Sequence, residues 1–466
     1  MRAITDLFQL IWPITGGYRL FLPYVLDRTW PVMRRAAWLH RRVIMRKTRV
    51  VTVVGSVGKT TTKRLVDAAL GEGVSRHTAG NYGASLALNV LYSRPWDTAA
   101  VFEVGIAGPG RMAGYARMLR PHIVVVTAVK SDHNRSLPTL EHTREEKVKM
   151  VRALAPGGLA VLNGDDPHVR WMATQTRARV VTFGFEPQNE VRASDVQVEW
   201  PQGTRFTLHA QGQEREVRTR LIGGHLVYPV LAAVAVGLAE GVSLDELIRR
   251  AEQVAPTPQR LELIRLDSGA MILSDEFKGS LESFHAALET LAQIPAKRRI
   301  AVLGPIHEPQ GSDGDVYRTL GRHAARAADR IIFIGHTKSF KALRAEAVRS
   351  GMMRESIMRV GEGVGEAIRV LRQEVRDGDV VLLKGAATQR LERIRLALQG
   401  TTVRCPATEC KVRSFTCETC PLRDQPETVL ENTYVRLLVK HTPGHGARHP
   451  QGSSSQRGVE RACAAS

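Results

Sequence analysis

A glycine-containing segment near the start of the chain combines the residue types that bind phosphate. It reads VVGSVGKTTTK from Val53 to Lys63 and separates a strand-like run from a helix-like run. Glycine lets backbone N–H groups approach phosphate oxygens, and a helix N-terminus favours negative charge. Lys59 has the reach to contact the β- and γ-phosphates of ATP, and the Thr60 hydroxyl is placed to bind Mg²⁺. The predicted nucleotide-binding residues of this segment are Gly55, Ser56, Val57, Gly58, Lys59, Thr60 and Thr61.

The spacing of the two glycines differs from that of the common phosphate-binding loop. The common pattern has four residues between its glycines, whereas only Ser56 and Val57 separate Gly55 from Gly58 here. A structural turn that carries an incidental lysine is therefore the simpler alternative. The strand before the turn and the helix after it favour the phosphate site.

A second group of residues that could bind a ligand is a cluster of cysteines near the C-terminus. All five cysteines lie at or beyond position 405, and four of them stand in CPATECKVRSFTCETC with gaps of four, six and two residues. Four thiolates suffice for a closed tetrahedral zinc site, and a two-residue gap is usual in such sites. Four free thiols in a loop or an iron–sulfur cluster are the alternatives. The predicted zinc ligands are Cys405, Cys410, Cys417 and Cys420.

The segments around these residues alternate between strand-like and helix-like patterns. Strand-like runs RVVTVV, TAAVFEVG, HIVVVTAV and GLAVLNGDD stand between helix-like stretches in residues 49–255. A second series, AMILSDEF, RRIAVLG, DRIIFIG and DVVLLKG, occupies residues 256–400. Strands that alternate with helices predict mostly parallel sheets covered on both faces. The expected fold is α/β, with a P-loop-type central domain and a second, Rossmann-like domain.

Three shorter segments complete the predicted organisation. Residues 1–48 form an apolar and basic N-terminal segment, residues 401–425 hold the cysteine cluster, and residues 426–466 form a tail that we expect to be disordered at its end. Cysteines are absent from the main body of the chain, which is typical of a protein of the reducing cytoplasm.

The N-terminal segment holds much of the positive charge. The net charge is +20, and residues 1–50 contain ten Lys or Arg but two Asp. The apolar run from Phe8 to Leu26 is too interrupted by Pro and Gly for a spanning helix. The basic stretch that follows predicts either an interfacial segment on anionic lipid or a helix packed on the first domain with a solvated basic face. Membrane contact through residues 1–49 would place the protein at the inner face of the membrane. A nucleic-acid partner is not expected, because the sequence shows no basic groove with interspersed aromatic residues.

The loop GSVGKTT resembles the ATP loop of the Mur ligase superfamily, whose members are ADP-forming enzymes that join a carboxylate to an amine. Further family motifs follow in order along the chain, namely TAGN, FEVG, RPHIVVVTAVKSDH, EEKVKMVRAL and LNGDDP. PQRLE, ILSDEF, IAVLG and VVLLKGA resemble the C-terminal domain of the branch that adds D-alanyl-D-alanine to muramoyl tripeptide. The resemblance covers about residues 50–400.

The resemblance implies a role for each matching residue. Thr60 and Glu103 would hold one Mg²⁺, and His133 with a carbamylated Lys147 would hold a second. The implied catalytic residues are Lys59, Glu103, His133 and Lys147. Asn81, Arg260, Asp275 and Lys384 would contact the nucleotide or the acyl phosphate. Each residue also has an ordinary structural alternative, such as a surface acid, a loop histidine or a solvated lysine.

The resemblance is weaker where the family recognises its substrate. Only 48 residues precede the first strand, in place of the domain that holds a UDP-sugar in the muramoyl branch. HLVYP, from His225 to Pro229, lacks two asparagines of the family pattern, Gly83 replaces another, and SDEFK replaces DDxYN. We therefore expect an ATP-dependent amide ligase, in cell-wall or related biosynthesis, that acts on a carboxylate other than a UDP-linked precursor. The alternatives are a nucleotide-binding scaffold without ligase activity and a basic, nucleic-acid-associated ATPase.

Overall fold

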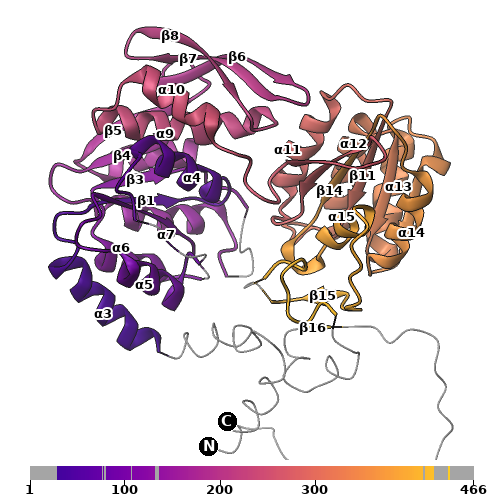
Figure 1. The fold of residues 1–466 in the computed structure, drawn as a ribbon, viewed down its shortest axis with the longest axis horizontal. Coiled ribbons are helices and arrows are strands. Elements are labelled where there is room, and N and C mark those ends of the chain that lie inside the picture. Colours follow the sequence, from indigo (N-terminus) through magenta and orange to yellow (C-terminus); the bar gives the residue numbers. More distant parts are fainter. Residues whose placement is uncertain are drawn as a thin grey trace, which may run out of the picture.

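A computed structural model describes residues 29–75, 77, 80–106, 108–131, 136–412, 415–424 and 439–440. Most of these residues form two α/β domains that lie side by side, each built on one sheet with helices against its faces (Figure 1). The expected α/β class with mostly parallel sheets is confirmed. Within the described ranges, no helix has the length and apolar character needed to cross a membrane.

The first domain is built on an eight-stranded sheet with the order β2-β1-β3-β4-β5-β6-β7-β8. Strands β1 to β6 pair in parallel, and β6, β7 and β8 pair antiparallel. The strands are β1 (Arg49–Val54), β2 (Ala99–Val104), β3 (Ile123–Val126), β4 (Leu159–Asn163), β5 (Arg179–Gly184), β6 (Val191–Glu199), β7 (Gly203–Ala210) and β8 (Gln213–Thr219). The helices are α4 (Lys59–Leu70), α5 (Gly83–Tyr92), α6 (Arg111–Leu119), α7 (Leu140–Val151), α8 (Pro167–Arg170), α9 (Val227–Ala239) and α10 (Leu244–Gln253), with short 3₁₀ helices η1 (Trp171–Gln175) and η2 (Gly224–Leu226).

The central strands of this sheet are buried on both faces. Val51 and Val53 of β1 face a core that includes α4 and α9, whereas Val50 and Val54 face a second core that includes α5, α6 and α7. Uninterrupted runs of β-branched residues suit parallel strands with helices on both sides. This burial explains why the strand-like runs of the sequence are apolar throughout rather than alternating.

The second domain is built on a six-stranded sheet with the order β13-β12-β11-β14-β10-β9. All neighbours pair in parallel except β9 and β10. Its strands are β9 (Glu262–Arg265), β10 (Met271–Asp275), β11 (Arg298–Leu303), β12 (Arg330–Ile334), β13 (Ile357–Val360) and β14 (Asp379–Lys384). Its helices are α11 (Leu281–Ala292), α12 (Asp313–Ala327), α13 (Thr337–Arg349), α14 (Gly365–Glu374) and α15 (Glu392–Leu398), with η3 (Arg354–Ser356) and η4 (Ala387–Gln389).

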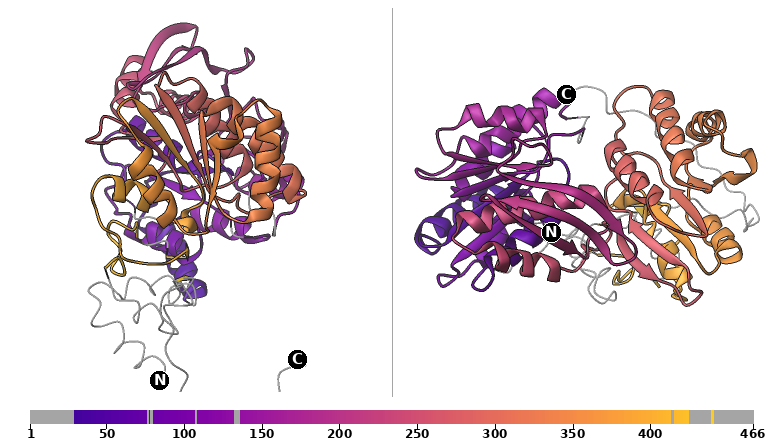
Figure 2. Two further views of the ribbon diagram at one scale, coloured as in Figure 1. Left: turned by 90° about the vertical axis from the view of Figure 1, so that its right-hand side faces the viewer. Right: turned by 90° about the horizontal axis from the view of Figure 1, so that it is seen from above.

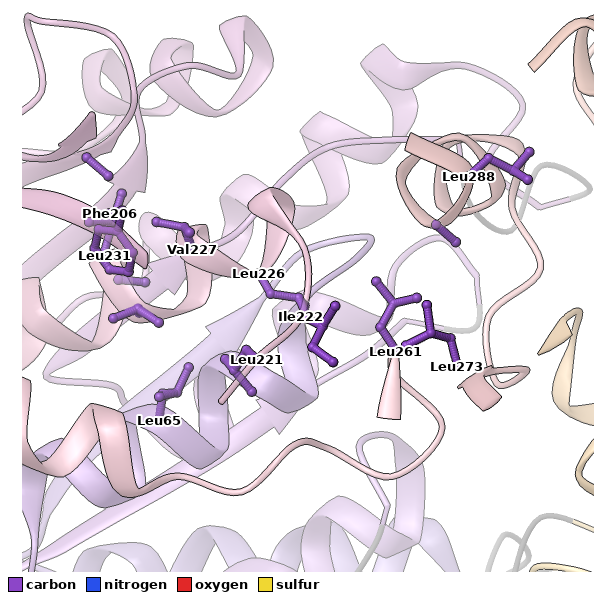
Figure 3. Packing of buried hydrophobic residues seen from close by; sticks show 14 of the residues in the cluster. Leu65, Phe206, Leu221, Ile222, Leu226, Val227, Leu231, Leu261, Leu273 and Leu288 are labelled. Carbon is purple, nitrogen blue, oxygen red and sulfur yellow. The ribbon is translucent and has the colours of Figure 1, made fainter. Parts of the chain in front are cut away.

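The two domains share apolar contacts at their junction. Ile222 and Leu226 of the first domain lie beside Leu261 and Leu273 of the second, all within one continuous buried cluster (Figure 3). The turn between β6 and β7 also reaches the second domain (Figure 2). Trp200 in this turn lines a cavity of about 310 Å³ together with residues near the start of β10 and β14. The junction is therefore a packed interface and not only a linker.

The basic segment before β1 forms helix α3 (Trp30–Val43), which packs on α5 and α6. Ala37 and Arg41 are buried in this contact, and Arg41 Nε donates to the Leu119 carbonyl at the end of α6, at 2.8 Å. Burial, together with the nearby charge of Arg120, lowers the pKa of Arg41 to about 10. The remainder of the N-terminal segment, residues 1–28, lies outside the described residues.

The C-terminal segment contributes a small two-stranded sheet. Strand β15 (Glu409–Cys410) pairs antiparallel with β16 (Val439–Lys440). The end of the tail, for which we expect disorder, lies outside the described residues.

Candidate active site

The phosphate-binding segment forms a tight turn between β1 and α4, as the sequence predicts. Gly58 has φ 79° and stands at the N-terminus of α4, so its left-handed backbone suits glycine. A Cβ at Gly55 would lie only 1.9 Å from Oγ1 of Thr127. Thr127 in turn donates to the Val57 carbonyl at 2.6 Å, and Ser56 Oγ donates to the Lys130 carbonyl at 2.9 Å. The end of β3 therefore fixes the loop, and glycine at position 55 permits that approach.

Two lysine ammonium groups converge on the carbonyl oxygen of Gly55. Lys59 Nζ and Lys147 Nζ each donate to it at 3.0 Å, and Lys59 also contacts the Ser56 carbonyl at 3.2 Å. Lys147 comes from α7 and is 2% exposed, whereas Lys59 is half-buried. The loop therefore has two lysine side chains beside it, of which Lys59 can neutralise anionic oxygens at that point.

Glu103, at the carboxyl end of β2, accepts hydrogen bonds from two polar side chains. Thr60 Oγ1 donates to one carboxylate oxygen of Glu103 at 2.8 Å, and Asn81 Nδ2 donates to the other at 2.7 Å. The parallel register places Glu103 opposite Val53, directly before the loop. A carboxylate and a hydroxyl at a helix N-terminus form a ligand set that Mg²⁺ accepts.

The second domain contributes a buried lysine–aspartate pair. Asp275 and Lys384 end adjacent strands, β10 and β14, and are register partners. Lys384 is 0% exposed, and its Nζ lies 3.0 Å from Asp275 Oδ2. Burial lowers the pKa of Lys384, and the Asp275 carboxylate opposes that shift. Asp275 and Lys384, which lie more than a hundred positions apart in the sequence, therefore form a buried ion pair.

Arg260 links the two halves of the site. Burial lowers the pKa of its guanidinium, while the negative charges of Asp275 and Glu103 oppose that shift, so the arginine interacts with carboxylates of both domains. The guanidinium lies 4.2 Å from the centroid of the Phe277 ring. Close by, Thr61 Oγ1 lies 3.2 Å from Thr257 Oγ1. The structure thus brings the loop, Glu103 and the second-domain residues together.

The backbone around Arg260 is held in an unusual conformation. Its neighbours Gln259 and Leu261 have φ of 58° and 47°, in the left-handed region that non-glycine residues seldom adopt. Leu261 is buried in the cluster that joins the domains (Figure 3). This packing compensates the local strain and directs Arg260 toward the site.

Sequence reasoning missed Glu276, a charged residue in the interior of the second domain. It is fully buried, and Ser274 Oγ donates to both of its carboxylate oxygens, at 2.7 and 2.8 Å. Burial raises the pKa of Glu276 to about 8, and nearby Glu392 and Asp275 add to the shift. The only signal in the sequence is an extra acid directly after Asp275 at the end of a buried strand.

Two predicted features cannot be placed. His133 lies outside the described residues, as do Thr78 and Ala79 of the TAGN motif. Just before His133, Ser131 N donates to Glu282 Oε1 at 3.3 Å, so the loop that leads to it contacts α11 of the second domain.

The predicted zinc site is not supported by the structure. No group of three or more His, Cys, Asp or Glu side chains among the described residues, which include all four predicted ligands, is arranged to hold a metal ion. Instead, the buried Arg393 donates from Nε to Cys417 Sγ at 3.2 Å, and its Nη2 lies 3.5 Å from Cys405 Sγ. Burial raises the pKa of Cys417 to about 12, so this side chain is a neutral thiol when no metal is bound. Cys405, Cys410, Cys417 and Cys420 are free cysteines.

Family profiles match both domains. The Mur ligase middle domain matches residues 53–237, which include the loop, Glu103 and Lys147. The Mur ligase, glutamate ligase domain matches residues 259–387, which include Arg260, Asp275 and Lys384.

Individual relatives agree with these profiles. The chain is 30% identical over 370 residues to the UDP-N-acetylmuramoyl-tripeptide–D-alanyl-D-alanine ligase of Mycobacterium bovis, which covers 75% of this chain and 72% of that protein. In fold it is similar to MurF from Acinetobacter baumannii, with a TM-score of 0.70, 22% identity and coverage of 80% and 81%. It is also similar to the MurF ligase of Thermotoga maritima in complex with ADP, with a TM-score of 0.69, 21% identity and coverage of 80% and 84%. The chain therefore belongs to the Mur ligase family of ATP-dependent, ADP-forming amide ligases.

Proposed function

We propose that the protein uses ATP to convert a substrate carboxylate into an acyl phosphate, which an amine then attacks to form an amide. The observation that carries this proposal is the convergence of Lys59, Lys147 and the Thr60–Glu103 pair on one phosphate-type loop. A carboxylate does not react with an amine until it carries a good leaving group. Phosphoryl transfer to a carboxylate brings anionic oxygens together, and positioned cations lower that barrier.

The oxygen atoms around Glu103 suit a magnesium ion. Thr60 Oγ1 and Glu103 Oε2 lie 2.8 Å apart at the N-terminus of α4, and Mg²⁺ in nucleotide sites takes such ligands together with phosphate oxygens. Thr60 and Glu103 would hold this ion, and His133 with carbamylated Lys147 would hold a second. Bound Mg²⁺ would neutralise the phosphate oxygens during transfer.

Lys147 is the residue that we propose to be carbamylated. It is buried on α7 beside the loop, with Nζ 3.0 Å from the Gly55 carbonyl. An ammonium next to two divalent cations would be repelled, whereas a carbamate offers oxygen ligands. The modified side chain would position the second ion close to the substrate carboxylate.

The second domain would complete the site when it closes over the nucleotide. The charge of Glu103 acts on the pKa of Arg260, and we propose that Arg260 contacts nucleotide phosphate. Asp275 would bind the ribose, and Lys384 would stabilise the acyl phosphate. Closure would also keep water from the mixed anhydride.

The substrate acid is proposed from the positions that depart from the family pattern. His225 lies at η2 without the two asparagines, Gly83 begins α5, and Ser274 to Lys278 replace DDxYN. These changes favour a carboxylate other than a UDP-linked muramoyl peptide, such as a lipid-linked acid, a cofactor acid or a polymer end. Relatives that ligate D-alanyl-D-alanine make amino acids and dipeptides the first amines to test.

The test is a search for condensed products. Purified protein with Mg²⁺-ATP and the small-molecule and lipid fractions of a cell extract should form ADP together with a new amide, which mass spectrometry identifies. Lys59→Ala is the control and should form neither. ADP formation without any condensed product, at the same rate with and without extract, would contradict the proposal.

A further inference from the structure

The outer flank of the first domain holds most of the exposed apolar side chains in the described part of the chain. The described residues of both domains include ten exposed large hydrophobic side chains, and seven of them lie on α3, on the turn that follows it or at the end of α5 and just beyond. We call these seven residues the α3 face: Val32, Trp38, Leu39, Val43, Ile44, Tyr92 and Trp96, exposed by 38% to 69%. A single exposed apolar residue is ordinary, but a cluster marks an interaction surface.

Three residues of the α3 face form one apolar row along the helix. Val32, Leu39 and Val43 are spaced by seven and four residues, so they line one side of α3. The opposite side of the helix is buried through Ala37 and Arg41. His40 Nε2 and the Ser93 carbonyl lie 2.8 Å apart, so the segment that carries Tyr92 and Trp96 is held against α3. Figure 1 shows α3 outside α5 and α6, on the flank away from the second domain.

The charges around the α3 face are positive. α3, α5 and α6 together contain no Asp or Glu. Exposed Arg35 and Arg46 flank the apolar row. The guanidinium of Arg42 lies 3.8 Å from the centroid of the Trp38 ring, and that of Arg94 lies 5.6 Å from Trp96. An acid on the adjoining segment, Asp97, accepts a hydrogen bond from Arg94 N.

We propose that the α3 face docks on the surface of an anionic phospholipid membrane. An amphipathic helix that exposes apolar residues and tryptophan beside arginines binds at the headgroup level of such membranes. Each arginine near an anionic surface adds about fivefold to the affinity. A second copy of the chain is a poorer occupant, because a symmetric contact would bring the arginines of both copies together. The proposal does not depend on the ligase chemistry, so the two can fail separately.

Co-sedimentation of the full chain with vesicles tests this contact. The probe is a phosphatidylcholine vesicle with or without phosphatidylglycerol. We expect binding to the anionic vesicles, little binding to pure phosphatidylcholine, and release at high salt because the Debye length shortens. The double variant Leu39→Ser/Val43→Ser should lower the partition coefficient at least about tenfold, because two inserted apolar side chains are lost. Both residues are exposed, so the fold should be unaffected.

The matched control is Val348→Ser/Met353→Ser. It removes two apolar side chains of the second domain that are exposed by 41% and 71%, and it should bind as the wild type does. Three results would overturn the proposal. One is the absence of binding to anionic vesicles. Another is undiminished binding by Leu39→Ser/Val43→Ser, which would assign the contact to residues 1–28. The third is a dimer in light scattering that this variant dissociates, which would make a second copy the occupant.

Discussion

Replacing Gly55 with alanine should disable the phosphate loop through a steric collision. The new Cβ would lie 1.9 Å from Oγ1 of Thr127, 3.1 Å from the Cβ of Thr127 and 3.2 Å from the backbone nitrogen of Ala128. A carbon and an oxygen that are not bonded cannot approach so closely, so either the loop or the end of β3 must move. The side chain of Thr127 cannot simply turn away, because its hydroxyl holds the Val57 carbonyl at 2.6 Å.

The size of the effect follows from these contacts. Loss of the Thr127 hydrogen bond costs about 1 kcal/mol, and overpacking a tight site costs about 1–3 kcal/mol. If the loop yields, about 3 kcal/mol of distortion must be reversed when nucleotide binds. Affinity for Mg²⁺-ADP should then fall about a hundredfold, since about 1.4 kcal/mol corresponds to a factor of ten.

Isothermal titration with Mg²⁺-ADP measures this loss, and thermal unfolding verifies that each variant is folded. Gly58→Ala is the matched control, because its Cβ would meet nothing closer than 3.9 Å and only the left-handed backbone is penalised, by about 1–2 kcal/mol. It should lose about tenfold in affinity. Thr127→Ala in the Gly55→Ala background should recover part of the binding, because it removes the colliding oxygen. Wild-type affinity in Gly55→Ala, or no recovery in the double variant, would refute the steric reasoning.

Three further predictions concern single side chains. Lys59→Ala should abolish ATP turnover while the unfolding temperature stays near that of the wild type, because the Lys59 ammonium donates to two carbonyls of its own loop and is not part of a core; unchanged phosphate release would contradict the loop assignment. Lys147→Ala should still bind ATP but lose acyl-phosphate formation, and CO₂-depleted buffer should slow the wild type; full turnover under both conditions would exclude the carbamate. Glu276 has a pKa of about 8 when folded, above its ordinary value of 4.5, so the folded state binds the proton more tightly and stability falls as pH rises from about 4.5 to about 8. Glu276→Gln should remove this trend, so denaturant midpoints of wild type and variant should diverge as pH rises toward 8; parallel profiles would contradict the assignment.

Local sequence patterns sufficed for the elements that carry the nucleotide loop. The apolar run RVVTVV becomes β1, and the helix-like run after the loop becomes α4, which begins at Lys59 and ends before Gly71. The antiparallel extension β6 to β8 was not anticipated. β8 is mostly exposed and polar, so hydrophobic periodicity gives little signal there.

Contacts between distant residues were beyond reach of local patterns. The pairing of Asp275 with Lys384 depends on the register of β10 and β14, and the sequence alone does not state which strands are neighbours. Two arginines show the same limit. The sequence pattern assigns Arg41 to a basic helix face, but in the structure its buried side chain donates to the carbonyl at the end of α6. Arg393 contacts two of the cysteine sulfurs for which we predicted zinc. Both outcomes are decided by tertiary packing.

The central claim is that the carboxylate is activated by phosphoryl transfer, and isotope transfer tests it most directly. Once the extract assay has identified the acid, that acid is prepared with ¹⁸O in its carboxylate and incubated with the protein, Mg²⁺-ATP and the amine. Attack by a carboxylate oxygen on the γ-phosphate leaves that oxygen bound to phosphorus when the amide forms. We expect one ¹⁸O atom in each inorganic phosphate released, with ADP as the other product. Unlabelled phosphate, or AMP in place of ADP, would contradict it.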